Sequence, residues 1–195
     1  MGAVIFDRSI SFAVAPIMVG LFLCAALGDE PASSSTAEIS VCFAPEQDCA
    51  AFATAAIDKA QREILVGSYN LTTGAGIVEA LIRAKQRGVA VQLITDKTTP
   101  CERDSGVAPL MAAAVPIWID YRVRIAHAKT MVVDGIATLA GSFNWTRAAS
   151  MNSEDLNLIS SPAVAALYAT HWQQRLAASV VFIRQEDWCS MKVRR

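Results

Sequence analysis

The 195-residue sequence has few charged residues and almost no net charge. Only 18% of its residues are charged, 53% are hydrophobic, and 17 Lys and Arg stand against 18 Asp and Glu. A chain this hydrophobic is not typical of disordered proteins, and its length suits one compact domain. Because the formal charge is −1, affinity for nucleic acid would have to come from locally gathered cations.

The sequence also has little that could bind a metal ion. It contains two histidines, and none of its five cysteines forms a C-x-x-C pair, so a zinc site is the weaker explanation of the cysteines. No cluster of carboxylates accompanies the candidate catalytic residues described below. We therefore expect neither a metal nor another cofactor.

The one long hydrophobic run lies near the N-terminus. Residues 10–27 carry no charge, follow Arg8 and end at the small residues Ala26 and Gly28. This pattern predicts a secretory signal peptide over residues 1–28, and hence a periplasmic or secreted protein. A retained membrane anchor is the alternative, because the run just reaches spanning length. Residues 29–37 are predicted to be a linker, and residues 38–195 one folded domain.

Cleavage of the signal peptide would leave an even number of cysteines, namely Cys42, Cys49, Cys101 and Cys189. An even number in an exported chain favours disulfides. Cys42 and Cys49 are close enough in sequence to join the end of a strand to the start of the next helix. Cys101 and Cys189 are then the remaining pair.

Strands and helices alternate along the predicted domain. Strands are expected at 39–43, 64–69, 89–95 and 117–119, and helices at about 47–62, from 77 to a stop at Gly88, and 107–114. Asp134-Gly135 then predicts a hairpin between strands 124–133 and 136–140. A strand at 155–159 and a helix from Pro162 to about Ala178 follow. This order predicts a single α/β domain whose mixed β-sheet has helices on both faces.

Two segments of the sequence share one pattern. Residues 67–72 and 141–146 both read Gly-Ser-aromatic-Asn-apolar-Thr, and each follows a predicted strand. The similarity arises either by chance or because the sheet has two related halves.

A constellation of polar residues lies around the predicted hairpin. His127, Lys129 and Asp134 have the spacing H-x-K-x4-D, and Ser142 and Asn144 follow the second strand. Period two along a strand places His127 and Lys129 on one face and Asp134 on the other. An imidazole can attack or relay protons, while an ammonium and neutral donors hold an anionic oxygen. Taken singly, such residues are more often ordinary packing or surface residues; together they predict a phosphate-binding pocket.

This constellation resembles the phospholipase D superfamily, whose H-x-K-x4-D motif with a following G-S-x-N is matched here without a gap. More closely, residues 41–178 are similar to the small exported bacterial endonucleases of that superfamily, which carry one motif per chain. The similarity also includes residues 42–49, 117–120, 125–127 and 152–154. It therefore covers nearly the whole predicted domain.

The resemblance implies a two-step hydrolysis of phosphodiesters, and we expect it to be metal-independent because Lys129 supplies the positive charge that a metal would bring. His127 would be the nucleophile that forms a phosphohistidine, with Lys129, Ser142 and Asn144 around the phosphoryl oxygens. Glu154 would accept the other N–H of the imidazole and so select its tautomer, and Asp134 would be structural.

The chemistry needs a second histidine to protonate the leaving oxygen. The other histidine, His171, is predicted to pack on a helix face with Val164, Leu167, Tyr168 and Trp172. The resemblance instead implies a homodimer in which an identical chain supplies a second His127 across a two-fold axis.

The expected substrate follows from local charge. Residues 121–147 carry Arg122, Arg124, Lys129 and Arg147 against Asp134 alone. The three arginines are therefore candidates for contacts with a DNA or RNA backbone, which predicts a nonspecific endonuclease. A phospholipase D that cleaves phospholipid headgroup esters is the alternative, and an apolar rim around the pocket would favour it. A non-catalytic module that binds nucleic acid is the third. Trp145 either stacks on a base or packs, and we expect packing.

Overall fold

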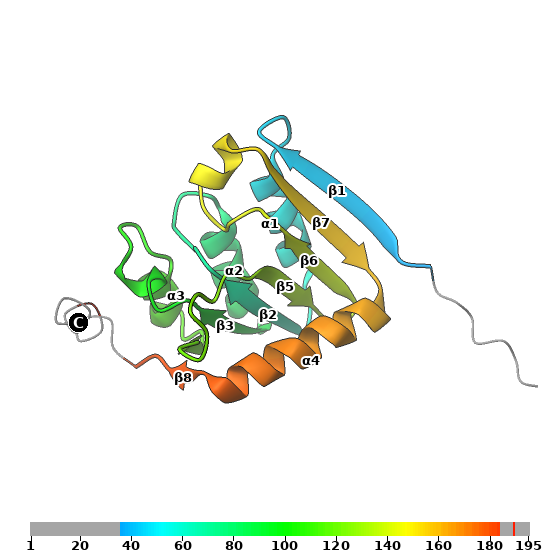
Figure 1. The fold of residues 1–195 in the computed structure, drawn as a ribbon. Coiled ribbons are helices and arrows are strands. Elements are labelled where there is room, and N and C mark those ends of the chain that lie inside the picture. Colours follow the sequence, from blue (N-terminus) through cyan, green and yellow to red (C-terminus); the bar gives the residue numbers. More distant parts are fainter. Residues whose placement is uncertain (1–35, 184–188, 190–195) are drawn as a thin grey trace, which may run out of the picture. The chain divides into compact units, whose positions relative to one another are not determined.

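The computed structural model describes residues 36–183 and Cys189 (Figure 1). These residues belong to one compact unit, Ser35–Arg195. The predicted signal peptide, and the linker as far as residue 35, lie outside the described residues. None of the described helices has the length and hydrophobicity needed to cross a membrane.

An eight-stranded mixed sheet forms the centre of this unit, in the order β1-β7-β6-β5-β2-β3-β4-β8. Strands β2, β3 and β4 are parallel, and the other neighbouring pairs are antiparallel. The strands are β1 (Glu38–Ala44), β2 (Glu63–Ser68), β3 (Ala90–Thr95), β4 (Ile117–Ile119), β5 (Lys129–Val133), β6 (Ala137–Gly141), β7 (Glu154–Ser160) and β8 (Val180–Val181).

Helices cover both faces of the sheet, as the sequence predicts. Helix α4 crosses one face in front of β6, β5 and β2 in Figure 1, and α1 and α2 lie behind the sheet. The helices are α1 (Cys49–Lys59), α2 (Ile77–Gln86), α3 (Val107–Ala112) and α4 (Pro162–Ala178), with two 3₁₀ turns, η1 (Thr99–Cys101) and η2 (Ala148–Met151). The predicted α/β fold class and mixed sheet are confirmed.

The sheet separates two hydrophobic cores, and alternate residues of a strand point to different ones. Ile64 and Val66 of β2 point to the larger core, which contains buried residues of α1, α2 and α3. Leu65, between them, points to the smaller core, where it meets Trp172 of α4. Period two therefore places successive side chains of one buried strand in different layers.

The hairpin forms at Asp134-Gly135, as predicted. Both residues have positive φ, 53° and 67°, and the Ile136 N–H donates to the Val133 carbonyl at 3.1 Å. Two adjacent positive φ values match the right-handed twist of paired strands, and Asn-Gly and Asp-Gly favour them.

The first strand of the hairpin is shorter than predicted. β5 begins at Lys129 rather than at Arg124, and residues 121–128, which we call the strap, have no regular secondary structure. The Asp120 and Asp96 carboxylates accept the backbone N–H groups of Arg122 and Ala126, so these groups are not available to a strand ladder. The prediction that residues 124–128 continue the strand is therefore wrong.

The predicted disulfide is present. Cys42 of β1 is joined to Cys49, the first residue of α1, with an S–S distance of 2.05 Å. Cys101 is joined to Cys189, which is the pairing that remained once the first was assigned.

The two segments with the shared pattern lie side by side. Strands β2 and β6 both pair antiparallel with β5, so they run in the same direction and their C-terminal ends lie at the same end of the strands of the sheet. Beyond that end, Leu71 and Trp145 form a parallel bridge, and the Trp145 N–H donates to the Asn70 carbonyl at 3.1 Å. Trp145 is fully buried in this bridge and so packs, as expected.

Candidate active site

Three strand ends meet at one edge of the sheet and position the candidate catalytic residues. β2 ends at Ser68, β6 ends at Gly141, and β5 begins between them at Lys129, whose register partner is Ser68. A Cβ on Gly141 would collide with the Asp155 carbonyl, so β6 can pass β7 this closely only with glycine at that position.

Lys129 and His127 are in direct contact at this edge. The Lys129 Nζ lies 2.9 Å from Nδ1 and 3.1 Å from Nε2 of the imidazole, and donates to the His127 carbonyl at 3.0 Å. Lys129 is buried, whereas the side chain of His127 is exposed. Burial lowers the pKa of Lys129, and the negative charge of Glu154 opposes that shift.

Tyr69 completes this contact, and sequence reasoning missed it. Its ring centroid lies 4.4 Å from that of His127, and the Lys129 Nζ lies 5.0 Å from the same ring. An ammonium within about 6 Å of an aromatic ring is attracted to its face. Tyr69 is the aromatic residue of the first shared-pattern segment, so that pattern was the signal available in the sequence.

Glu154 contacts Ser142 rather than His127. The Ser142 hydroxyl donates to the Glu154 carboxylate and accepts from the Asp155 N–H at 3.1 Å. The Asn152 amide donates to the other oxygen of Glu154 at 3.2 Å. Among the described residues, no hydrogen bond joins Glu154 to His127, so the contact implied by the resemblance is not present. Glu154 instead acts on the charge of Lys129.

Asn144 follows Ser142 by two residues, and buried Phe143 lies between them. The Asn144 Oδ1 is buried and has no hydrogen-bond partner in the part of the chain that the structure describes. Such an amide retains hydrogen-bonding capacity that its own fold does not use.

Asp134 lies at the opposite end of β5 from Lys129. Its carboxylate accepts the backbone N–H groups of Gln61, Arg62 and Glu63 at 2.7 to 3.0 Å, and its carbonyl accepts from the Arg62 guanidinium. Burial would raise the pKa of Asp134, but these N–H groups and the Arg62 charge outweigh it and lower the pKa. The carboxylate therefore binds the backbone that enters β2 and faces away from His127.

Two buried carboxylates that sequence reasoning missed hold the strap. Asp120 accepts the Arg122 N–H at 3.0 Å, and Asp96 accepts the Ala126 N–H at 2.8 Å. Between these points, the Lys97 ammonium donates to the Arg124 carbonyl at 3.1 Å. Asp96 and Asp120 each follow the last residue of a parallel strand, which was the available signal.

The strap exposes two of the three candidate substrate-binding arginines, Arg122 and Arg124. Arg147 is also exposed, but it borders a different hollow, which Glu46 and Asp48 also line. The structure therefore places two of these arginines on the strap, which also carries His127, and the third beside a different hollow.

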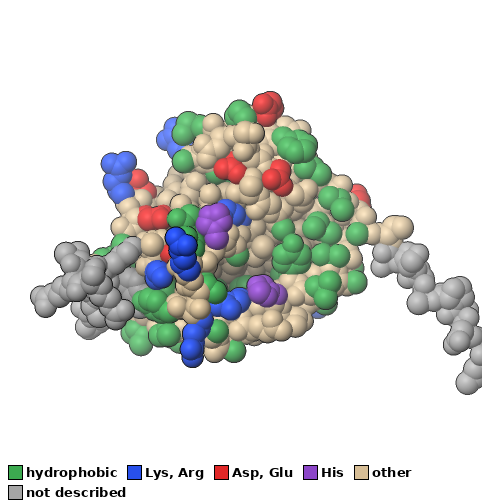
Figure 2. Space-filling view, in the orientation of Figure 1, with side chains coloured by type: hydrophobic (Ala, Val, Ile, Leu, Met, Phe, Trp, Pro, Cys, Tyr) green, Lys and Arg blue, Asp and Glu red, His purple; other side chains and the backbone are tan. Residues whose placement is uncertain are grey.

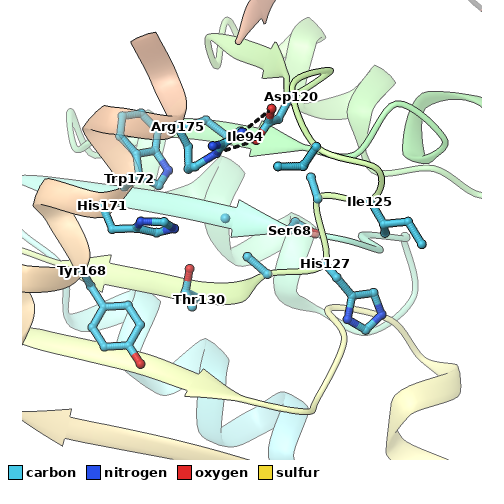
Figure 3. Close-up of a pocket in the computed structure, with 14 residues that line it drawn as sticks. Ser68, Ile94, Asp120, Ile125, His127, Thr130, Tyr168, His171, Trp172 and Arg175 are labelled. Carbon is cyan, nitrogen blue, oxygen red and sulfur yellow. Dashed lines mark hydrogen bonds and ion pairs between the residues drawn. The ribbon is translucent and has the colours of Figure 1, made fainter. Parts of the chain in front are cut away.

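A cavity of about 410 Å³ lies between the strap and α4, and both His127 and His171 line it (Figure 3). In Figure 2 the two histidines stand on opposite sides of a hollow. His171 is exposed, and Leu167 is 72% exposed, so the prediction that they pack on the sheet is wrong. Helix α4 instead packs through Ala165 and Trp172, which leaves the predicted stripe partly facing solvent.

The described residues contain no group of three or more His, Cys, Asp or Glu side chains close enough to hold a metal ion. The cation that contacts the imidazole is the Lys129 ammonium.

Comparison with known proteins assigns this fold and site to a family. A family model described as cardiolipin synthase, PLD-like domain, matches residues 53–176. A phospholipase D from Rickettsia conorii is 34% identical over 146 residues, which cover 74% of this chain and 72% of that protein. A mitochondrial cardiolipin hydrolase from Xenopus tropicalis is 30% identical over 116 residues, covering 57% of this chain and 55% of that one.

A solved structure agrees with these matches. The phospholipase D family member Nuc from Salmonella typhimurium is 30% identical and superposes with a TM-score of 0.71, covering 76% of this chain and all of that one. The chain therefore belongs to the phospholipase D superfamily of phosphodiesterases.

Proposed function

We propose that the protein hydrolyses the phosphodiester bonds of nucleic acids, with His127 as the nucleophile. The observation that carries this proposal is the contact of the buried Lys129 ammonium with the exposed His127 imidazole. A phosphate oxygen that binds Lys129 is brought beside the imidazole, and Asn144 follows the neighbouring strand as a further donor. The Ser142 hydroxyl, which donates to Glu154 in this structure, would donate to the phosphate by turning away from that carboxylate.

The reaction proceeds in two steps. A ring nitrogen of His127 bonds to phosphorus while the ester P–O bond breaks, and the leaving oxygen takes a proton from an acid. Water then attacks phosphorus and gives up a proton, the N–P bond breaks, and the imidazole is restored. Lys129 supplies positive charge to the phosphoryl oxygens in both steps, which makes a metal ion unnecessary.

The proton donor in this proposal is His127 of a second copy. Ile39, Val41 and Phe43 alternate along the edge strand β1 and are 56%, 43% and 56% exposed, on the sheet face that α4 covers elsewhere. Figure 2 shows hydrophobic side chains gathered beside the hollow that contains the histidines. An exposed apolar surface of this kind is typical of a protein interface. We propose that a symmetric homodimer uses this surface and that the second copy of His127 reaches the site across the two-fold axis.

Two features concern the substrate. Arg122 and Arg124 are exposed on the strap beside His127, which supports contacts with successive phosphates of a nucleic acid. A phospholipid is the second candidate substrate, because Val123, Ile125 and other apolar residues line the cavity next to His127.

We also propose export to the periplasm or beyond the cell, on the basis of residues 10–27, so mature protein should begin at Asp29.

One parallel assay tests the proposed function. Protein from Asp29 onward is offered plasmid DNA, RNA and phosphatidylcholine vesicles in excess EDTA, with His127→Ala as the control. We expect nucleic acid to be degraded by the wild type alone. Degradation that requires a divalent ion, or that survives His127→Ala, would contradict the mechanism. Hydrolysis of the lipid alone would establish the second candidate.

A further inference from the structure

The cavity beside His127 is a slot between two walls. Tyr168, His171 and Trp172, at helical spacing, present their rings from α4, and Val123 and Ile125 lie on the strap (Figure 3). Rings on one side and branched aliphatic side chains on the other suit a flat group inserted between them.

Both walls are held in place by hydrogen bonds. Asp120 accepts the Arg122 N–H of the strap and also binds the Arg175 guanidinium of α4 through two contacts of 2.7 Å. The Trp172 Nε1–H donates to the Val66 carbonyl at 2.9 Å, which fixes the indole against β2. The slot is therefore formed before any ligand arrives, and a ligand does not have to order it.

The polar groups of the slot indicate what it binds. Within residues 36–183, the Thr130 hydroxyl, the Tyr168 hydroxyl and the His171 imidazole make no side-chain hydrogen bond, and all three residues line the cavity. A hydrocarbon chain would take these groups from water without returning a hydrogen bond, which costs free energy. A nucleobase has a face that stacks on rings and an edge that hydrogen-bonds.

We infer that this slot is a nucleobase subsite, which takes the base of a nucleotide that adjoins the scissile phosphate. The inference rests on the proposed nuclease function and adds the subsite to it. Its position follows from His127, which lines the same cavity, so a phosphate at His127 carries its nucleoside toward the slot. The Arg175 guanidinium donates to the Asp120 carboxylate, so we assign it to the lining of the slot and not to a contact with phosphate.

Cleavage of hexathymidylate tests the inference bond by bond. The protein is offered the intact oligomer and an analogue in which one internal thymine is replaced by hydrogen, and product lengths give the rate at each linkage. We expect one of the two linkages that flank the abasic nucleotide to be cleaved about tenfold more slowly, because the stacked base is missing. The remaining linkages should be cleaved at unchanged rates.

Variants at the slot separate this effect from other causes. His171→Ala and Ile125→Ala each remove one exposed side chain from one of the two walls, and should bring the intact and abasic oligomers to within about twofold of each other. Gln174→Ala, exposed on the same helix but outside the cavity lining, should keep the full difference.

The subsite would be overturned, but not the nuclease function, if the wild type cleaved each linkage of the abasic oligomer at the same rate as the same linkage of the intact oligomer. A slower cleavage beside the abasic nucleotide that persists in both slot variants would overturn it as well. Failure of the wild type to cleave either oligomer or plasmid DNA would overturn the proposed function and the subsite together.

Discussion

The Lys129 Nζ lies within 3.1 Å of both ring nitrogens of His127, so one buried cation contacts an imidazole that is exposed. A phosphate oxygen that binds this cation is therefore brought close to the ring. The Tyr69 ring lies beside both the imidazole and the ammonium, and the negative charge of Glu154 favours the charged form of Lys129. The four residues therefore form one electrostatic unit.

The pH dependence of catalysis should report the charge of Lys129. Its pKa is lowered from 10.5 by burial, and hydrolysis that needs the ammonium is lost as the pH rises through that lowered value. Because Glu154 opposes the shift, Glu154→Gln should move the alkaline limb of kcat/KM to lower pH. Lys129→Arg should remove the contribution of residue 129 to this limb, since a guanidinium stays charged, and leave the fall that comes from deprotonation of the proton donor.

The control for this profile is Glu46→Gln, which removes an exposed carboxylate that does not act on Lys129. It should leave the alkaline limb where it is. An unchanged limb in Glu154→Gln, measured in protein with the wild-type Tm, would show that Glu154 does not act through Lys129.

Asp134→Asn should reduce stability and leave turnover per folded molecule near that of the wild type. The carboxylate accepts three backbone N–H groups, and an amide that turns its NH₂ toward them costs about 1–3 kcal/mol. The pKa of Asp134 is lowered in the fold, so its stabilising contribution is present above the ordinary value of 3.8 and lost as pH falls through the lowered value. The difference in unfolding free energy between wild type and variant should therefore shrink in acid.

Urea unfolding at several pH values, beside kcat measurements, decides this point. An unchanged unfolding free energy with a large loss of turnover would give Asp134 a catalytic role instead.

The two disulfides should stabilise the fold unequally. Cys42–Cys49 spans seven residues and Cys101–Cys189 spans 88, and chain entropy predicts about 2–3 and 4–5 kcal/mol. Urea unfolding of Cys42→Ser/Cys49→Ser and Cys101→Ser/Cys189→Ser variants measures this order. Peptide mass spectrometry of unreduced protein checks the pairing, and free thiols at Cys42 and Cys49 would refute it.

Mixed dimers test whether two chains share one site. Wild-type and His127→Ala chains are mixed in equal amounts, denatured and refolded together. If each site needs two copies of His127, activity should fall to about one quarter of that of the same total amount of wild type, because only wild-type homodimers work. A fall to about one half, or full activity in a monomer, would contradict the shared site and make His171 the candidate acid.

Local patterns in the sequence predicted the central part of this fold. Asp134-Gly135 carries its turn preference in two adjacent residues, and the buried strands carry theirs in continuous apolar runs. The spacing of His127 and Lys129 predicted that both side chains point the same way, although the strand on which that prediction rested begins only at Lys129. These features depend on near neighbours in the chain, which a single sequence contains.

Contacts between distant elements were not predictable in the same way. Residues 124–128 of the strap were expected to be part of a strand, because nothing near them in the sequence indicates that Asp96 and Asp120 accept N–H groups of the strap. His171 was expected to pack, because helical periodicity cannot specify how far α4 is rotated about its axis over the sheet. Tyr69 reaches His127 only because β2 and β5 are neighbours, which is a property of strand order.

The central claim is that His127 bonds covalently to phosphorus, and capture of that intermediate tests it most directly. Wild-type protein and His127→Ala are mixed with excess single-stranded DNA, quenched in alkali within milliseconds, and mapped by peptide mass spectrometry. The account predicts a nucleotide attached through phosphorus to the peptide that contains His127, stable in alkali and released in acid, and absent from the variant. An adduct on another residue, or rapid hydrolysis with no adduct on His127 at any quench time, would contradict it.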